Sequence, residues 1–342
     1  MTQDSLSIFV LGVTGYIGGS LLRRLAIQYP QAHITALVRN NNVAALFQEA
    51  GVHELLLGSH KDLDTIETAC SNAELVINVA DCDDTELTAA VLRGLKKRFE
   101  KTGRRPVLIH TSGTGVICDR AHGVLNQAVA SAPYDDADEQ RTAAIPDEAY
   151  HRLVDKMIFQ ADSDGYIDGW IIAPPTIYGT STGPIRRPTF QIPVVIPRLA
   201  LAAKQPVVIG DGSATWDNVH IDDLIDLYEL LLVKALDNET RATRSSPYSK
   251  FVLVSSGKHT WSEATQAVAD ALHAKGLIPT KEIKSVSFEE AIALHPTAQW
   301  VCTNSFCVPR KARSWGWKPK HLGWRVYLEA DLEDGLKSLG VL

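Results

Sequence analysis

The sequence predicts an α/β fold in which a doubly wound parallel sheet is followed by a smaller C-terminal lobe. Three observations support this prediction. A glycine-rich segment near the N-terminus joins an apolar run to an amphipathic stretch, five short apolar runs alternate with helical stretches over about the first 115 residues, and the composition changes beyond about residue 180. Such alternation is typical of parallel sheets that bind ligands at the carboxyl ends of their strands.

The glycine-rich segment lies within residues 7–26, SIFVLGVTGYIGGSLLRRLA. It begins with a short apolar run typical of a buried strand, and apolar side chains then recur at helical spacing. Gly12, Gly15 and Gly18 lie between the two. Bare backbone N–H groups at a helix N-terminus bind phosphate, and a side chain at these glycines would hold a pyrophosphate away. The segment therefore predicts a dinucleotide-binding turn, with a purely structural turn as the alternative.

The second expected strand, residues 34–38, ends at Arg39. At this position a free ribose 2′-hydroxyl usually meets an acidic residue, whereas a 2′-phosphate meets a basic one. Arg39 therefore favours NADP(H) over NAD(H). The alternative is a surface arginine that merely flanks the asparagine-rich loop after it.

Two further strands supply candidate cofactor contacts. Residues 52–57 form an expected third strand, after which Asp62 and Leu63 are placed to edge an adenine ring. Residues 74–80 form a fourth strand that ends in Val79 and Ala80. These small side chains leave room for a ribose and a pyrophosphate.

A long helix over about residues 84–101 precedes the fifth expected strand, 107–110. His110, at the end of this strand, is expected to be a satisfied core histidine. Residues 119–145 show no sustained periodicity and are expected to form a long loop over the ligand edge of the sheet, either functional or merely solvated. A helix is expected from Pro146 to about Asp162, because proline suits the first helical position.

The chain then enters its second part. A sixth strand, residues 169–173, ends in PPTIYG, and the Gly-, Pro- and Arg-rich stretch after it marks the start of the second lobe. We expect residues 1–180 to form the dinucleotide-binding domain, with a return of the chain to it at about 213–235. Residues 181–342 would then form mainly a substrate-binding lobe, in which Trp216 is a candidate for the pocket or for packing.

Composition limits the classes of partner. The chain has 342 residues, 45% of them hydrophobic, and a formal net charge of -6. This balance disfavours a nucleic-acid partner, and no apolar run is long enough to span a membrane. The five cysteines lack metal-ligand spacing, so we expect free thiols, no metal site and a soluble cytoplasmic protein. A small-molecule substrate is expected, and the oligomeric state is left open.

Five motifs in order, GVTGYIGG, VINVA, PPTIYG, VHIDDL and WGWKP, resemble those of the extended short-chain dehydrogenases/reductases, the NAD(P)-dependent epimerase/dehydratase-like family. The resemblance covers nearly the whole chain, although Leu11 stands where the family's turn usually begins with threonine. It implies a Rossmann domain, an NAD(P) cofactor and a substrate lobe. Together with the residues above, the expected cofactor contacts are Gly12, Thr14, Gly15, Tyr16, Ile17, Gly18, Arg39, Asp62, Leu63, Val79, Ala80, Thr111, Pro174, Thr176 and Ile177.

The catalytic residues depart from the family pattern. The family uses a serine or threonine after the fifth strand, a tyrosine as proton donor, and a lysine four residues later that lowers the tyrosine pKa. The resemblance places that serine at Gly113, the tyrosine near Asp147 and the lysine near His151, so no Tyr-x-x-x-Lys exists here. Four residues are candidates to replace them: Ser112, Thr114, Tyr150 and His151.

In a helix that begins at Pro146, residues Asp147, His151 and Asp155 share one face. Tyr150 and Lys156 are separated by about 600° of helical rotation, so a dyad of these two is not expected. Imidazole can act alone as an acid or base near neutral pH. The alternative for His151 is an ordinary surface pair with Asp147.

These observations leave three functions open. The first is an NADP(H)-dependent enzyme that acts on a small carbonyl or alcohol through an atypical site. The second is a non-redox isomerase, lyase or cyclase on the same fold, because the usual proton donor is missing. The third is a non-catalytic NADP(H) sensor, which the retained substrate lobe disfavours.

Overall fold

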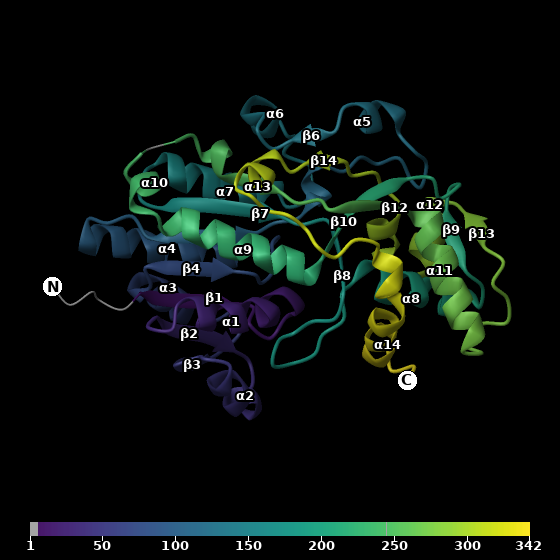
Figure 1. Ribbon diagram of the computed structural model, residues 1–342, viewed down its shortest axis with the longest axis horizontal. Helices are drawn as coiled ribbons and strands as arrows, with labels where there is room; N and C mark the ends of the chain where they lie inside the picture. The colour runs from purple at the N-terminus through teal and green to yellow at the C-terminus, as the bar shows by residue number, and fades with distance from the viewer. Residues whose placement is uncertain (1–5, 244) are drawn as a thin grey trace.

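The computed structural model describes residues 6–243 and 245–342 and is organised around a seven-stranded parallel sheet (Figure 1). The order runs outward from β1 in both directions, as in doubly wound folds. The strands are, from one edge to the other, β11 (Phe251–Leu253), β7 (Asp168–Ala173), β5 (Val107–Thr111), β4 (Leu75–Asn78), β1 (Ser7–Leu11), β2 (His33–Val38) and β3 (Glu54–Leu57). The predicted fold class is confirmed.

Helices cover both faces of this sheet. One face packs against α1 (Tyr16–Gln28), α2 (Ala44–Glu49) and α9 (Ile221–Leu236), and the other against α3 (Leu63–Asn72), α4 (Thr85–Thr102) and α7 (Arg152–Ser163). The core of each face is built from the apolar side chains of the strands and of these helices, because the strands are buried on both sides. The carboxyl ends of β1, β4 and β5 therefore meet at one edge, where a ligand can reach them.

A second lobe lies beyond that edge and has its own apolar core. Figure 1 shows its helices on the right of the view, with the small sheets beside them. Its helices are α8 (Ile196–Ala203), α11 (Trp261–Ala274), α12 (Phe288–Leu294) and α14 (Leu328–Ser338). Its strands are β8 (Thr176–Tyr178), β9 (Val207–Ile209), β10 (Thr215–His220), β12 (Gly257–Thr260) and β13 (Lys284–Val286). Strands β12, β10 and β8 form one sheet, and β13 pairs with β9.

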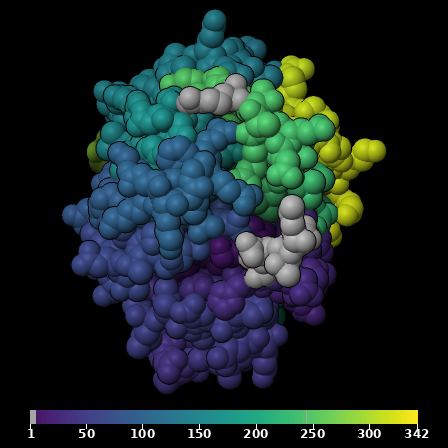
Figure 2. All heavy atoms as spheres, turned by 90° about the vertical axis from the view of Figure 1, so that its left-hand side faces the viewer, coloured from purple at the N-terminus to yellow at the C-terminus, as the bar shows by residue number. Residues whose placement is uncertain are grey.

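Late segments of the chain return to the first core. In Figure 2 green and yellow segments lie beside purple and blue ones, at the end of the molecule away from the second lobe. Helix α9, strand β11 and the short helix α13 (Arg310–Ser314) contribute side chains to the cores of the large sheet. The sequence predicted a return of the chain to this sheet only at about residues 213–235, whereas β11 and α13 also pack against it. The division of the chain at residue 180 stays a proposal.

Residues 119–145 are more ordered than the sequence predicted. They contain α5 (Gln127–Ser131), β6 (Tyr134–Asp135) and α6 (Glu139–Ala143). Strand β6 pairs with β14 (Cys307–Val308), a segment more than 170 residues away. Because this pairing partner is distant in sequence, local periodicity could not reveal it.

The expected helix from Pro146 is wrong at its start. Helix α7 begins at Arg152, and His151 before it has a left-handed backbone, with φ +65°. A left-handed residue cannot continue a right-handed helix. Asp147, His151 and Asp155 therefore do not form one helical stripe, and Asp147 instead pairs with Lys156, at 2.7 Å between Oδ2 and Nζ.

Short helices complete the fold: η1 (Asn41–Val43), η2 (Thr114–Ile117), η3 (Gln191–Val195), α10 (Asn238–Ala242), η4 (Pro247–Lys250), η5 (Pro296–Val301) and η6 (Trp324–Val326). In the part of the chain that the structure describes, every helix is too short or too polar to cross a bilayer.

Candidate active site

The glycine-rich turn between β1 and α1 forms a close-packed cradle. Gly12 has φ +90°, and a Cβ added there would lie 2.5 Å from the carbonyl oxygen of Val79. A Cβ at Gly18 would lie 2.2 Å from the carbonyl oxygen of Gly12. Gly15 is the N-cap of α1 and offers no capping side chain, so the first N–H groups of the helix are left to a ligand. This geometry fits a dinucleotide pyrophosphate.

The other expected cofactor residues divide into two groups. Tyr16, Ile17, Val79, Pro174 and Ile177 line a cavity beside the cradle. Several of the rest make bonds within the protein, which gives them a structural task whether or not a cofactor binds.

The hydroxyl of Thr111 is 2.5 Å from that of Tyr228, and Thr176 donates to Gln191 at 2.6 Å. The Asp62 carboxylate accepts from the Ser59 N–H at 2.6 Å, just before Leu63 begins α3. The Thr14 carbonyl accepts from the Arg187 guanidinium at 3.0 Å. Ala80 donates its N–H to the Asn78 side chain at 3.2 Å.

Arg39 lies directly after β2 and is exposed. Its position at the carboxyl end of a strand next to β1 is where a ribose substituent of a bound dinucleotide lies in this kind of fold. The guanidinium is therefore accessible to a 2′-phosphate.

The cavity beside the cradle has a volume of about 490 Å³ and lies between the two lobes' elements. Its wall combines residues from the ends of β4, β5 and β7 with residues from the second lobe. The lining residues are Tyr16, Ile17, Val79, Cys82, Asp83, Gly113, Thr114, Gly115, His151, Pro174, Pro175, Ile177, Pro188, Thr189, Phe190, Gln191, Trp216 and Trp300.

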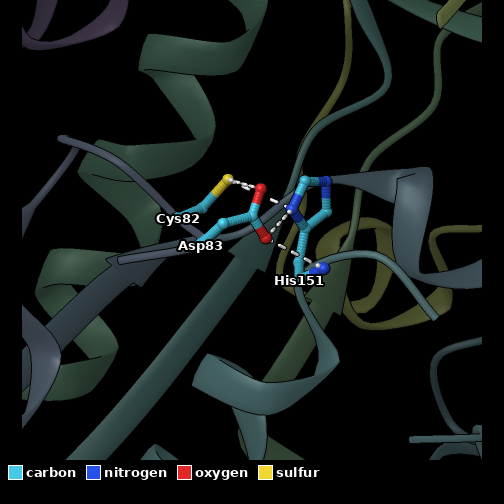
Figure 3. Close-up of side chains that lie close together, drawn as sticks. All are labelled: Cys82, Asp83 and His151. Carbon is cyan, nitrogen blue, oxygen red and sulfur yellow. Dashed lines mark hydrogen bonds and ion pairs between the residues drawn. The ribbon is translucent and has the colours of Figure 1, made fainter. Parts of the chain in front are cut away.

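Cys82, Asp83 and His151 meet at one side of this cavity (Figure 3). Nδ1 of His151 lies 2.9 Å from Oδ1 of Asp83 and 3.2 Å from Sγ of Cys82. The backbone N–H of His151 also donates to Oδ1 of Asp83, at 3.1 Å. Because carboxylate and thiol both approach Nδ1, the other ring nitrogen, Nε2, is left facing away from them. The three side chains are therefore not arranged as a relay from acid through imidazole to thiol.

Nε2 of His151 lies against the loop that follows β5. A Cβ added to Gly113 would lie 3.1 Å from it, and one added to Gly115 would lie 2.9 Å from it. Any side chain at Gly113 would therefore crowd the imidazole. The ring occupies the space beside the position where the resemblance places the family's serine.

The backbone of His151 is strained in order to reach this place. A left-handed conformation costs a non-glycine residue on the order of 1 kcal/mol, and such strain is often found at functional sites. The bond from the His151 N–H to Asp83 holds the conformation. The strain directs the imidazole toward the cavity instead of along helix α7.

The contacts between His151 and Asp83 determine the charge of each side chain. Burial opposes a charge on His151, but its hydrogen bonds to Asp83 and Cys82 outweigh burial and raise the His151 pKa to about 10. The same hydrogen bond to His151 lowers the pKa of Asp83, against a smaller opposite effect of burial. At neutral pH the pair is therefore an imidazolium and a carboxylate, and Nε2 carries a proton that it can donate.

The structure separates the other three catalytic candidates. Thr114 lines the cavity, and its buried hydroxyl has no hydrogen-bond partner among the described residues. Ser112 is buried and donates to Asp155 at 3.1 Å, away from the cavity wall. Tyr150 packs against Trp300 and points its hydroxyl at Gln299, at 3.3 Å. Only Thr114 and His151 of the four are lining residues.

His110 was expected to be satisfied, and the structure meets this expectation for one nitrogen. Nδ1 lies 3.3 Å from the amide of Asn78, whereas Nε2 has no hydrogen-bond partner in the described chain. Burial lowers the His110 pKa to about 3, so the ring is neutral. It does not line the cavity, which agrees with a core role.

Asp155 is a buried carboxyl beneath the site. Burial raises its pKa to about 7. The folded protein therefore binds a proton that the unfolded chain releases near pH 4, so this group lowers stability as pH rises from about 4 to above 7. We expect Asp155→Asn to stabilise the protein on the order of 2 kcal/mol at pH 8 and much less at pH 4, measured by urea unfolding at both values.

The exposed variant Asp147→Asn is the control for this measurement, because its surface pair with Lys156 is worth at most about 1 kcal/mol. A difference between Asp155→Asn and the unsubstituted protein that stays constant from pH 4 to pH 8 would refute the raised pKa of Asp155.

Sequence reasoning missed Cys82, Asp83 and the wall residues Phe190, Gln191 and Trp300. A signal for the first two was present, because they follow the fourth strand and the ends of neighbouring parallel strands meet at one edge. Trp300 belongs to η5 of the second lobe, more than 280 residues beyond the cradle, and carried no such signal.

The fold and the cradle define a Rossmann-type dinucleotide-binding protein. The sequence model of the NAD dependent epimerase/dehydratase family matches residues 8–242, and the chain belongs to this family of enzymes. The predicted family resemblance is confirmed.

Among known proteins, the chain is 27% identical over 350 residues to the oxidase ucsJ of Acremonium sp, covering 98% of this chain and 99% of that one. Two solved structures share its fold. A UDP-glucose 4-epimerase of Thermotoga maritima with UDP-glucose has a TM-score of 0.64 at 15% identity, covering 98% of this chain and 100% of that one. A dTDP-glucose 4,6-dehydratase of Bacillus anthracis in complex with NAD has the same TM-score and identity, covering 98% of each chain.

Proposed function

We propose that this protein is an NADP(H)-dependent oxidoreductase that interconverts a small-molecule carbonyl and alcohol, with His151 in place of the missing tyrosine as the proton donor. The observation that carries the proposal is the position of Nε2 of His151, beside Gly113 and on the wall of the cavity that adjoins the dinucleotide cradle. A protonated nitrogen at this place can serve the oxygen that the family's serine and tyrosine would otherwise serve.

The cofactor and three residues of the chain have separate roles in the proposed reaction. When bound, the cofactor supplies or accepts a hydride. His151 donates the proton on Nε2 to the substrate oxygen during reduction and takes it back during oxidation. Asp83 accepts a hydrogen bond from Nδ1, which fixes the ring and stabilises its charged form. Thr114 offers a hydroxyl without another partner among the described residues, which can orient the same oxygen.

The pH dependence of carbonyl reduction tests the proposal. Because the His151 pKa is raised to about 10, the donor is protonated at neutral pH. We expect kcat for NADPH-dependent reduction to be level from pH 7 to 9 and to fall about tenfold per pH unit above about 10, and kcat for oxidation to show the opposite trend. Asp83→Asn should move the break in the profile to lower pH, because it removes the carboxylate charge.

A reduction rate that stays level or rises above pH 10 would contradict this role of His151. Conversion of a substrate without net consumption of NADPH would instead favour a non-redox reaction on the same fold.

The preference for NADP(H) is expected to depend on Arg39. The exposed guanidinium after β2 can bind a 2′-phosphate by charge-assisted hydrogen bonds, each worth about 1.5–3 kcal/mol. We expect Arg39→Asp to lower the affinity for NADPH about 10- to 100-fold and to leave the affinity for NADH unchanged or improved. Calorimetric titration with both cofactors measures this, and an equal loss for both would contradict a 2′-phosphate contact.

A further inference from the structure

The wall of the cavity indicates what kind of substrate it accepts. Apart from the five residues expected to contact the cofactor, its largest side chains are the aromatic ones of Phe190, Trp216 and Trp300. Among the described residues, no lysine or arginine lines it. The two charged side chains of the wall, Asp83 and His151, form an ion pair with each other. The wall is therefore close to neutral.

A nucleoside diphosphate group would meet no net positive charge here. It carries about two negative charges, which proteins bind with arginine, lysine or helix N-termini. The N-terminus of α1 faces the cofactor cradle. The arginines near wall residues in the sequence have other partners, since Arg152 donates to the carbonyl of Ala143 at 2.9 Å, Arg186 pairs with Asp334 at 2.7 Å and Arg187 donates to the carbonyl of Thr14. The charge of the His151 imidazolium is already balanced by Asp83, so the wall offers a diphosphate no net positive charge.

Several polar side chains of the wall already make hydrogen bonds within the protein, so few of their donors and acceptors are free to bind a sugar. The Thr189 hydroxyl donates to the carbonyl of Ile177 at 2.5 Å, and the Tyr16 hydroxyl donates to that of Gly179 at 2.6 Å. Gln191 uses its amide oxygen to accept from Thr176 and its amide nitrogen to donate to Trp300. A sugar ring needs a partner for most of its hydroxyls, since an unpaired buried polar group costs about 1–3 kcal/mol.

The polar groups of the wall that have no hydrogen-bond partner in the described part of the chain include Nε2 of His151, the hydroxyl of Thr114 and the indole N–H of Trp216. Nε2 lies against Gly113, which Thr114 follows directly, so a single substrate oxygen can use these two groups. The Trp216 N–H can serve at most one further acceptor. The rest of the substrate would contact apolar and aromatic side chains. Phe190 keeps 45% of its surface exposed, so it can gain contact with a ligand at the rim.

We propose that the substrate is an uncharged and largely apolar compound with a planar, conjugated body and one reactive carbonyl or alcohol group, and that sugar nucleotides are excluded. The inference rests on the proposed function for the reaction at that group. It concerns binding by the wall, which can be measured without turnover.

Calorimetric titration of the NADP⁺-saturated protein with 2-naphthaldehyde and with UDP-glucose tests this inference. We expect 2-naphthaldehyde to bind at least about tenfold more tightly than UDP-glucose. Phe190→Ala and Trp300→Ala should each weaken 2-naphthaldehyde at least about fivefold, because each removes aromatic contact area from the ligand. Leu46→Ala, an exposed apolar truncation on α2, is the control and should change nothing.

Tighter binding of UDP-glucose, no binding of 2-naphthaldehyde, or unchanged binding in both aromatic variants would overturn the inference. Measurements of binding and of turnover distinguish a failure of the proposed reaction from a failure of the proposed substrate class. Binding of 2-naphthaldehyde without NADPH consumption would contradict the redox function and support the substrate class. Consumption of NADPH with a sugar nucleotide would support the redox function and contradict the proposed substrate class.

Discussion

Replacement of His151 by asparagine is expected to lower kcat for carbonyl reduction about 10²- to 10⁴-fold and to leave NADPH affinity within about twofold. The substitution removes the proton on Nε2 without disturbing the fold, because asparagine tolerates the left-handed backbone at this position better than most residues. Steady-state kinetics at pH 7.5, together with calorimetric titration of NADPH, measure the two effects separately.

The chain contains a matched control for this variant. His122 is also left-handed, with φ +48°, but its ring stacks on Phe288 and it does not line the cavity. His122→Asn should keep kcat within about twofold. If His151→Asn retains kcat while binding NADPH normally, another group donates the proton and the account of the site is wrong.

Gly18→Ala is expected to raise the dissociation constant for NADPH at least about 100-fold. Alanine is normally about 1 kcal/mol better than glycine in a helix, so a loss cannot come from helix propensity. The new Cβ would lie 2.2 Å from the carbonyl oxygen of Gly12 and 2.8 Å from the Val79 side chain, and the turn must move to relieve the clash.

Gly19→Ala, at the next position of the same helix, is a graded control. Its Cβ would lie 3.2 Å from the Val13 carbonyl, which a shift of a few tenths of an ångström relieves. We expect a loss of affinity well below that of Gly18→Ala. Equal affinities of the two variants and the unsubstituted protein for NADPH would show that the cradle does not hold the pyrophosphate.

The features that sequence reasoning predicted are local. The glycine turn, the five alternating strands and the helix after the fourth strand are each determined by neighbouring residues, through burial on both faces of a parallel sheet and through helical periodicity. The parallel, doubly wound character of the sheet followed from the alternation of strands with helices. The fold could therefore be predicted without any long-range contact.

The candidate site depends on contacts that sequence alone does not show. Asp83 lies 68 residues before His151 and bonds both its ring and its backbone N–H. That contact stabilises the left-handed conformation of His151, so helix α7 begins only at Arg152. Locally, Pro146 followed by two acidic residues is a favourable start for a helix. The local signal predicted a helical stripe, and the tertiary contact produced an ion pair on the wall of a cavity instead.

We propose His151 as the proton donor beside the cofactor, in place of the family's tyrosine. A crystal structure of the NADP⁺ complex would show which proton-bearing side chain lies on the cavity side of the nicotinamide ring. We expect this group to be Nε2 of His151, with the Thr114 hydroxyl beside it. A nicotinamide turned away from the cavity, or one that faces Tyr150 or Ser112 in place of His151, would contradict it.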